Sequence, residues 1–306
     1  MKTPHPLHGL VAATHTPFHA DGSLNTDAVG MQLAHLLKWN VTRVFIGGTT
    51  GESSSLTVDE RRSLAQRWCE AARGTAMQVI VHVGSNCLAD SAALARHAQQ
   101  HGAVAVSALA PSYFKPRSLE ALIACCAEIA AAAPETPFYY YDIPAMTGIQ
   151  FPMPEFLEKA SARIPNLAGI KFSNPDLMAY LRILGAGAGR WDVPWGIDEW
   201  MLGALATGAR GFVGSSYNFA APLYHRLIAA FEKGDLATAR EEQFRSTQVI
   251  SLLASHGYMG AAKATMGMLG VEVGPARLPN GSLPADQASR LRGELEAMGF
   301  FEWIQR

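Results

Sequence analysis

The sequence has little cysteine, no excess of charge of either sign and no long apolar run. Its 25 Lys and Arg residues nearly balance its 26 Asp and Glu residues, which leaves a formal net charge of -1. This balance gives no electrostatic reason to bind nucleic acid or an anionic membrane surface. No uncharged apolar stretch reaches the roughly 18 residues of a membrane-spanning helix. We therefore expect neither nucleic acid nor a membrane among the partners of this chain.

The four cysteines are Cys69, Cys87, Cys125 and Cys126, and no pair of them has CxxC spacing. The last two are adjacent and cannot easily form a disulfide with each other. We therefore expect reduced thiols in a reducing compartment and no metal site. The N-terminal stretch 1–18 has prolines and histidines where a signal peptide would have an unbroken apolar region. A cytoplasmic protein is the expectation.

The sequence does contain a regular alternation of β-rich runs with longer helix-like stretches. Its 306 residues, 49% of them apolar, can bury one large core. The β-rich runs are Gly9–Thr14, Arg43–Gly47, Gln78–Val83, Ala103–Leu109, Phe138–Ile143, Ala168–Phe172, Val193–Ile197 and Gly211–Gly214. Helix formers with apolar residues at helical spacing lie between them, at Thr57–Arg73, Asp90–His101, Leu119–Ala133, Met153–Ile164 and Trp200–Thr207. This order predicts parallel strands joined by helical crossovers.

Eight such units predict an α/β fold, a (β/α)8 TIM barrel with additional C-terminal helices. We expect a single domain over residues 1–306, with the barrel at about 8–225 and a C-terminal helical extension at about 226–306. The helices expected after the last strand are Pro222–Lys233, Leu236–His256, Ala261–Gly270 and Ala285–Met298. A doubly wound sheet is the alternative. It would usually carry a Gly-rich loop after its first strand, and the sequence has none there.

A single lysine, Lys171, lies inside the apolar run 167–173. Burial disfavours the charged ammonium group and lowers its pKa, so a buried lysine can carry a free amine at neutral pH. Such an amine can attack a carbonyl group and form a Schiff base. A lysine of an edge strand that extends its amine to water is the alternative.

In a barrel of this kind the chemistry takes place at the carboxyl ends of the strands. The loop 47–52 combines glycines with Thr49 and Thr50, which suits a carboxylate or another small anion, although such loops are often simple turns. In the fifth strand, Tyr139 and Tyr141 share one face by alternation. The second of them lies nearer the mouth, where a phenol can relay a proton. Tyrosines that only pack in the core are the alternative.

The ends of the last three expected strands also carry polar residues. Ser173 lies two residues after the lysine and therefore on the same face of its strand. Asp198 and Glu199 could bind sugar hydroxyls or could cap the helix expected after them. Ser215 adds a further hydroxyl donor at the end of the last strand. The mouth therefore combines an amine, a phenol, hydroxyl groups and two acids.

Together these motifs resemble the dihydrodipicolinate synthase/N-acetylneuraminate lyase family of class I aldolases. The resemblance runs nearly end to end, from residues 10–14 to residues 274–279. The motifs that carry it are GGTTGE (47–52), YYYDIPAMTG (139–148), GIKFS (169–173), GIDE (196–199) and GSSYN (214–218). Within the family, the chain is most similar to the N-acetylneuraminate lyases.

The resemblance implies a role for each matching residue. Lys171 would form the Schiff base, and Tyr141 would donate and accept the proton. Thr49 and Thr50 would hold the pyruvate carboxylate, and Tyr113 would reach toward the site of a neighbouring subunit. The positions that would hold the hydroxylated chain of the sugar are Ser173, Gly196, Asp198, Glu199 and Ser215.

The resemblance also implies a homotetramer, a dimer of dimers, that needs no cofactor beyond the covalent lysine imine. Its implied reaction is cleavage of N-acetylneuraminate, a small sugar keto acid, to pyruvate and N-acetylmannosamine. A related 2-keto-3-deoxy sugar-acid aldolase, a metal-dependent aldolase and a non-catalytic sugar-acid sensor are the alternatives. Met146 stands where the dihydrodipicolinate synthases carry an arginine for a second carboxylate, which argues against that activity. Asp142 stands where an Asn is common after the tyrosine.

Overall fold

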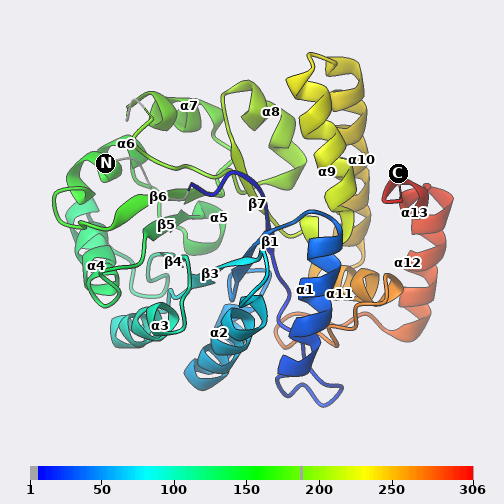
Figure 1. Ribbon diagram of the computed structural model, residues 1–306, viewed down its shortest axis with the longest axis horizontal. Helices are drawn as coiled ribbons and strands as arrows, with labels where there is room; N and C mark the ends of the chain where they lie inside the picture. The colour runs from blue at the N-terminus through cyan, green and yellow to red at the C-terminus, as the bar shows by residue number, and fades with distance from the viewer. Residues whose placement is uncertain (1–5, 187–188, 306) are drawn as a thin grey trace.

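The computed structural model describes residues 6–186 and 189–305 of the chain (Figure 1). Within these ranges seven strands form one sheet in the order β6-β5-β4-β3-β2-β1-β7, and each neighbouring pair is parallel. The strands are β1 (Gly9–Ala13), β2 (Arg43–Ile46), β3 (Gln78–His82), β4 (Ala105–Ala108), β5 (Phe138–Asp142), β6 (Leu167–Phe172) and β7 (Gly211–Gly214). The sheet is curled, and helices surround it (Figure 1).

Helices connect successive strands and continue after the sheet. Those before β7 are α1 (Val29–Lys38), α2 (Val58–Ala72), α3 (Leu88–Gln100), α4 (Leu119–Ala131), α5 (Pro144–Thr147), α6 (Met153–Ala160), α7 (Leu177–Ala186) and α8 (Met201–Ala206). After β7 come α9 (Tyr217–Glu232), α10 (Leu236–Ser255), α11 (Tyr258–Met268), α12 (Ala285–Ala297) and α13 (Phe300–Trp303). The helices α9 and α10 pack side by side, and α11 contacts both (Figure 1). No helix in the described ranges is long and apolar enough to span a membrane.

The helices predicted from the sequence are found, with shifts of a few residues at their ends. The start of α2 is set by a capping box, in which Thr57 Oγ1 accepts from the Glu60 N–H at 3.2 Å and Glu60 Oε2 accepts from the Thr57 N–H at 2.9 Å. The helix α9 begins earlier than expected, at Tyr217. It continues through Pro222 because the backbone bends at Ala220, just before the proline. The helices α1 and α7 are not among the segments that the sequence pattern predicts.

The segment expected as a strand at Val193–Ile197 does not form a regular ladder. This segment forms only isolated bridges, and Pro194 within it has no N–H to donate to a ladder. It nevertheless forms hydrogen bonds on both sides. The Phe172 N–H donates to the Pro194 carbonyl at 2.9 Å, and the Trp195 N–H donates to the Gly211 carbonyl at 2.9 Å. The segment therefore lies between β6 and β7, which are the two ends of the sheet order.

The two faces of the curled sheet have different packing partners. Residues that alternate along the strands form an inner apolar cluster, which includes Val11, Ala13, Phe45, Ile80, Ala105, Tyr139, Tyr141, Ala168 and Val213. Residues of the other face, among them Tyr140 and Ile170, belong to the main core with the helices. Tyr139 and Tyr141 therefore share the inner face, which confirms the expectation from strand alternation.

The approach of the 192–197 segment to β6 depends on Gly169. A Cβ at this position would lie 1.7 Å from the carbonyl oxygen of Asp192. That carbonyl accepts from the Ile170 N–H at 3.1 Å, and the Asp192 carboxylate accepts from the Tyr139 hydroxyl at 2.7 Å. Two backbones can come this close only because residue 169 has no side chain.

Replacement of Gly169 by alanine should therefore destabilise the fold by about 3 kcal/mol or more, because the added methyl group forces the 192–197 segment away from β6. Urea unfolding followed by circular dichroism measures this change. Gly185→Ala, in α7, is the matched control, because a Cβ there meets nothing within 4 Å. Unfolding midpoints that match for the two variants would contradict the close approach.

Candidate active site

Lys171 and Tyr141 lie side by side at the carboxyl ends of β6 and β5. The two residues are partners in the parallel register of these strands. The Nζ atom of Lys171 lies 3.8 Å from the centre of the Tyr141 ring and 3.9 Å from the centre of the Phe45 ring. Phe45 belongs to β2, so side chains from three strands meet at the amine.

Burial controls the charge state of Lys171. The residue is 4% exposed, and desolvation lowers the pKa of its ammonium group, while Tyr141 and Asp198 partly oppose the shift. More of this side chain is therefore free amine at neutral pH than in an exposed lysine. The alternative of an edge-strand lysine with its amine in water is wrong, because so little of the side chain reaches the surface.

The loop 47–52 brings Thr49 next to this pair. Thr49 Oγ1 and the Tyr141 hydroxyl oxygen are 3.3 Å apart. The loop is a tight curl, because Gly47 has a φ of 61° and a Cβ at Gly51 would lie 2.9 Å from the Gly47 nitrogen. Its shape therefore requires both glycines. The two threonines of the loop are half-buried, so both keep some accessible surface at the position predicted to hold a carboxylate.

His82 of β3 supports this loop and is not among the residues predicted for the site. Its Nδ1 is 2.8 Å from the Gly47 carbonyl oxygen, and its ring stands edge-on to Tyr141 with centroids 5.8 Å apart. Complete burial, with a smaller contribution from Arg61, holds the pKa of His82 well below its usual range. The neutral ring can then donate from Nδ1 to the Gly47 carbonyl. Alternation along β3, which directs Ile80 inward, is the signal that also directs His82 inward.

Asp198 is buried, and its carboxylate is bonded to Ser216. Its Oδ2 accepts from the Ser216 N–H at 2.9 Å and also from the Ser216 hydroxyl. Desolvation raises the pKa of this carboxyl group, and these hydrogen bonds partly oppose the shift. A Cβ at Gly214 would lie 1.8 Å from Asp198 Oδ1, so the glycine leaves the space that the carboxylate fills. Asp198 therefore bonds to the residue before α9 and does not cap the helix that follows it in sequence.

Ser173 and Gly196 meet beyond the end of β6. A Cβ at Gly196 would lie 2.0 Å from Ser173 Oγ, so the glycine leaves room for the hydroxyl. In the described part of the chain this buried Oγ has no hydrogen-bond partner. Buried polar atoms are normally paired, so this oxygen is available to a ligand. Glu199, by contrast, is exposed.

Ser215 is bonded to a residue of the C-terminal helices. Its hydroxyl lies 2.6 Å from the hydroxyl of Tyr258, the first residue of α11. Burial raises the pKa of Tyr258, so its hydroxyl stays protonated. The two residues are 43 positions apart, and no local sequence pattern connects them.

Tyr113 does not join this group. Its side chain is 79% exposed and packs edge-on against Phe114, with ring centroids 5.0 Å apart. Its backbone is held by Asn86, whose Oδ1 accepts from the Tyr113 N–H at 3.0 Å. The loop therefore presents two adjacent aromatic rings at the surface.

The reactive groups at this site are an amine, a phenol, hydroxyls and carboxylates. Across residues 6–186 and 189–305, no three His, Cys, Asp or Glu side chains are placed to hold a metal ion. The buried Lys171 amine beside Tyr141, at the carboxyl edge of a parallel sheet, is an arrangement suited to Schiff-base chemistry. Fold and site together define a parallel α/β protein with a buried lysine amine at the carboxyl edge of its sheet.

The chain belongs to the dihydrodipicolinate synthetase family, which it matches over residues 6–298. It is 40% identical over 289 residues to the N-acetylneuraminate lyase of Danio rerio, covering 93% of this chain and 94% of that protein. It is 42% identical over 276 residues to N-acetylneuraminate lyase A of Xenopus laevis, covering 89% and 90%. The solved structure of Proteus mirabilis N-acetylneuraminate lyase is similar with a TM-score of 0.93 at 39% identity, covering 96% of this chain and 99% of that chain.

Asp142, the neighbour of Tyr141, faces the opposite side of β5. It is 2% exposed, and its Oδ2 accepts from the Asn174 side chain at 3.3 Å. Desolvation raises the pKa of Asp142 to about 6, although the Asn174 hydrogen bond opposes the shift. The ionised carboxylate of Asp142 therefore lowers the free energy of unfolding at neutral pH.

Asp142→Asn should stabilise the fold at pH 7 and have little effect at pH 4. The folded-state pKa of about 6 lies above the ordinary 3.8, so the folded chain holds the proton more tightly. The stability that this proton contributes is present below pH 3.8 and is lost as the pH rises through 6. Its loss corresponds to about 3 kcal/mol at pH 7, and asparagine has no charge to bury. Urea unfolding at both pH values measures the effect.

Asp59→Asn is the control for this substitution, because the Asp59 side chain is 90% exposed. Its stability should change little at either pH. A gain for Asp142→Asn that is equal at pH 4 and pH 7 would contradict the raised pKa.

Proposed function

We propose that this chain is a class I aldolase, a carbon–carbon lyase that cleaves N-acetylneuraminate to pyruvate and N-acetylmannosamine. The observation that carries the proposal is the buried amine of Lys171, 3.8 Å from the centre of the Tyr141 ring. The similarity to N-acetylneuraminate lyases over nearly the whole chain supports the choice of substrate.

The reaction begins at the free amine of Lys171. The amine attacks the C2 ketone of the open-chain sugar acid, and loss of water leaves an iminium ion. Cleavage of the C3–C4 bond then sends its electron pair into the iminium, which gives a neutral enamine instead of a bare carbanion. Because the covalent imine is the electron sink, the step requires no metal ion and no organic cofactor. The lowered pKa of Lys171 favours the amine that starts it.

Tyr141 moves the proton that this cleavage releases. Tyr141 is a phenolate at this step, because it has given its proton to the hydroxyl group that leaves as water when the iminium forms. The phenolate takes the proton of the C4 hydroxyl as the C3–C4 bond breaks, so N-acetylmannosamine leaves as the aldehyde. Thr49 Oγ1, 3.3 Å from the phenol oxygen, completes the hydrogen bonding at this group. A proton then adds to C3 of the enamine, and water hydrolyses the imine to release pyruvate and restore Lys171.

The other polar residues of the mouth hold the two ends of the substrate. Thr49 and Thr50 orient the carboxylate, which replaces random collision by a fixed geometry. Asp198 Oδ2 is held by Ser216, which fixes the direction of this carboxylate at the mouth. A site built to bond hydroxyls rejects tails that lack them. The polyol tail is assigned to Ser173, Gly196, Asp198, Glu199 and Ser215.

We further propose that the sheet and the 192–197 segment form a (β/α)8 barrel within a single domain. The barrel spans about 8–225 and the helical extension about 226–306, and the hydrogen bonds of the segment to both β6 and β7 support this arrangement. We propose a homotetramer, a dimer of dimers, in the cytoplasm. The exposed rings of Tyr113 and Phe114 support a subunit contact that places Tyr113 near a neighbouring site.

Two of the alternatives keep the catalytic lysine and change the substrate. A 2-keto-3-deoxy sugar-acid aldolase would use the same Lys171 and Tyr141 with a different tail. A dihydrodipicolinate synthase would need a cation for its second carboxylate, and Met146, which is 63% exposed, cannot supply one.

Borohydride reduction in the presence of pyruvate should fix a covalent adduct on Lys171, because the reduced imine no longer hydrolyses. Peptide mass spectrometry locates the adduct. Lys171→Ala should give no adduct and no turnover, while Lys159→Ala should keep both, because Lys159 lies in an exposed ion pair with Glu120 and Glu155. Turnover that survives in Lys171→Ala would refute the Schiff-base role.

Glu199→Gln should lower kcat/KM for N-acetylneuraminate by roughly ten- to a hundredfold, which corresponds to the loss of one hydrogen bond to a charged group. Keto acids with shorter tails should be affected little, because they do not reach this carboxylate. Pyruvate release is the readout, and Glu155→Gln in α6 is the control. Equal losses with long and short substrates would favour the sugar-acid aldolase alternative.

A further inference from the structure

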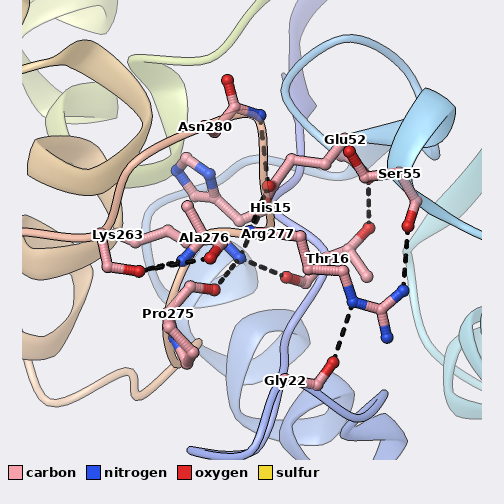
Figure 2. Close-up of polar contacts among 12 residues, drawn as sticks. His15, Thr16, Gly22, Glu52, Ser55, Lys263, Pro275, Ala276, Arg277 and Asn280 are labelled. Atoms are coloured by element: carbon pink, nitrogen blue, oxygen red, sulfur yellow. Dashed lines mark hydrogen bonds and ion pairs between the residues drawn. The ribbon is translucent and has the colours of Figure 1, made fainter.

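A buried ion pair connects the C-terminal part of the chain to the loop 47–52. Lys263 Nζ of α11 and Glu52 Oε1 are 2.8 Å apart, and their side chains are 2% and 0% exposed. Figure 2 shows these residues among their polar contacts. The Lys263 ammonium also donates to the Thr16 carbonyl at 2.9 Å and to the Pro275 carbonyl at 2.7 Å. The ammonium therefore combines two hydrogen bonds to backbone carbonyls with an ion pair to Glu52.

Glu52 has a backbone conformation that is rare for a residue with a side chain. Its φ of 53° and ψ of 38° lie in the left-handed region. Residues other than glycine stay in this region only where surrounding contacts hold them. The contacts of Glu52 come from the C-terminal segment: Oε1 pairs with Lys263, and Oε2 accepts from the Arg277 N–H at 2.8 Å and from Asn280 Nδ2 at 3.3 Å.

Two short routes of hydrogen bonds and ion pairs lead from Lys263 to the backbone of the loop 47–52. In the first, the Thr16 carbonyl accepts from Lys263, and Thr16 Oγ1 donates to the Gly51 carbonyl at 2.6 Å. In the second, Lys263 holds Glu52, whose N–H donates to the Thr49 carbonyl at 3.0 Å. The hydroxyl of this threonine is the one that lies 3.3 Å from the phenol of the site.

Arg277 anchors the segment that carries these contacts. Its guanidinium forms two hydrogen bonds to the Glu60 carboxylate, at 2.9 and 2.5 Å. It also donates to the carbonyls of Gly22 and Ser55, at 2.8 and 3.0 Å, and lies over the Phe18 ring at 4.2 Å. The arginine therefore joins the C-terminal segment to the loop after β1 and to the first turn of α2.

The charges of Lys263 and Glu52 fix the relative positions of these residues more than they stabilise the fold. A buried ion pair adds little stability compared with an apolar pair of the same size, but its partners must face each other. His15, labelled beside the pair in Figure 2, has no hydrogen-bond partner for either ring nitrogen within the described residues. Burial, and then the charge of Lys263, lower the pKa of His15 to about 3, so its ring is neutral. Glu52 is therefore the charge that balances Lys263.

We infer that Lys263 and Glu52 are positioning residues that shape the loop 47–52 for the carboxylate of the substrate. They act through the backbone of Thr49 and its neighbours and not on the reacting atoms. The identity of the anion, a 2-keto carboxylate, rests on the function proposed above. The inference makes α11 and the segment after it part of the machinery that recognises the substrate.

The test uses the double variant Glu52→Gln/Lys263→Met, which removes both buried charges together and leaves no unpaired ion. Borohydride trapping on Lys171 is titrated with pyruvate and with pyruvamide, which has the same ketone and no carboxylate. We expect the pyruvate concentration for half-maximal labelling to rise about tenfold, as for the loss of one hydrogen bond to a charged group. The value for pyruvamide should stay unchanged. Lys159→Met, which removes an exposed lysine, is the matched control and should leave both values unchanged.

Amide hydrogen exchange of a peptide that covers the loop 47–52 gives a second readout that does not depend on catalysis. Exchange should become faster in the double variant and stay unchanged in Lys159→Met. If the double variant does not fold, Glu52→Asp, which keeps the charge and shortens its reach, should give the same pyruvate-selective shift.

Equal shifts for pyruvate and pyruvamide would overturn the inference, and so would unchanged labelling together with unchanged exchange. A wild-type chain that gives no pyruvate adduct would instead refute the proposed function. In that case the exchange rate alone decides whether Lys263 orders the loop: faster exchange in the double variant supports the positioning role, and equal exchange overturns it.

Discussion

The desolvation of one amine is the constraint on which the rest of the site depends. Lys171 lies between the rings of Tyr141 and Phe45, where water cannot stabilise an ammonium charge, and its pKa is lowered for this reason. Such surroundings exist only inside a sheet that curls until the inner faces of β2, β5 and β6 meet. The Val193–Ile197 segment is hydrogen-bonded to both β6 and β7, the two ends of the sheet order. The lowered pKa of Lys171 is thus a consequence of how the sheet curls.

Glycines allow the close approaches that this closure requires. A side chain at Gly169 would collide with the Asp192 carbonyl, one at Gly196 with the Ser173 hydroxyl, and one at Gly214 with the Asp198 carboxylate. Gly196 lies within the 192–197 segment, and Gly169 and Gly214 pack against residues of or next to it. At each of the three positions a polar atom occupies the space that a Cβ would need. These glycines allow the backbones to pack closely and also leave room for polar groups of the site. A change in the packing at these positions would therefore also change the geometry of the site.

The C-terminal helices contact two of the loops that carry site residues. Tyr258, at the start of α11, bonds to Ser215 after β7, and Lys263, one turn further along, pairs with Glu52 after β2. One helix therefore contacts the loops that follow β7 and β2, the two strands that flank β1 in the sheet. Because this ion pair is buried, it adds little stability but fixes how its two partners face each other. Through the Glu52 N–H, which donates to the Thr49 carbonyl, the fixed geometry extends to Thr49.

The sequence by itself determined the features that local patterns encode: the alternation of parallel strands with helices, the shared face of Tyr139 and Tyr141, and the lysine in an apolar run. Only the tertiary structure decided which distant polar groups meet. It showed isolated parallel bridges at Val193–Ile197 in place of a regular ladder, because a proline there cannot donate to a ladder. It also joined Asp198 to Ser216, and residues of α11 to the mouth. Side-chain alternation depends on neighbours in the chain, whereas hydrogen bonds and ion pairs depend on the path of the whole chain in space, which no local pattern records.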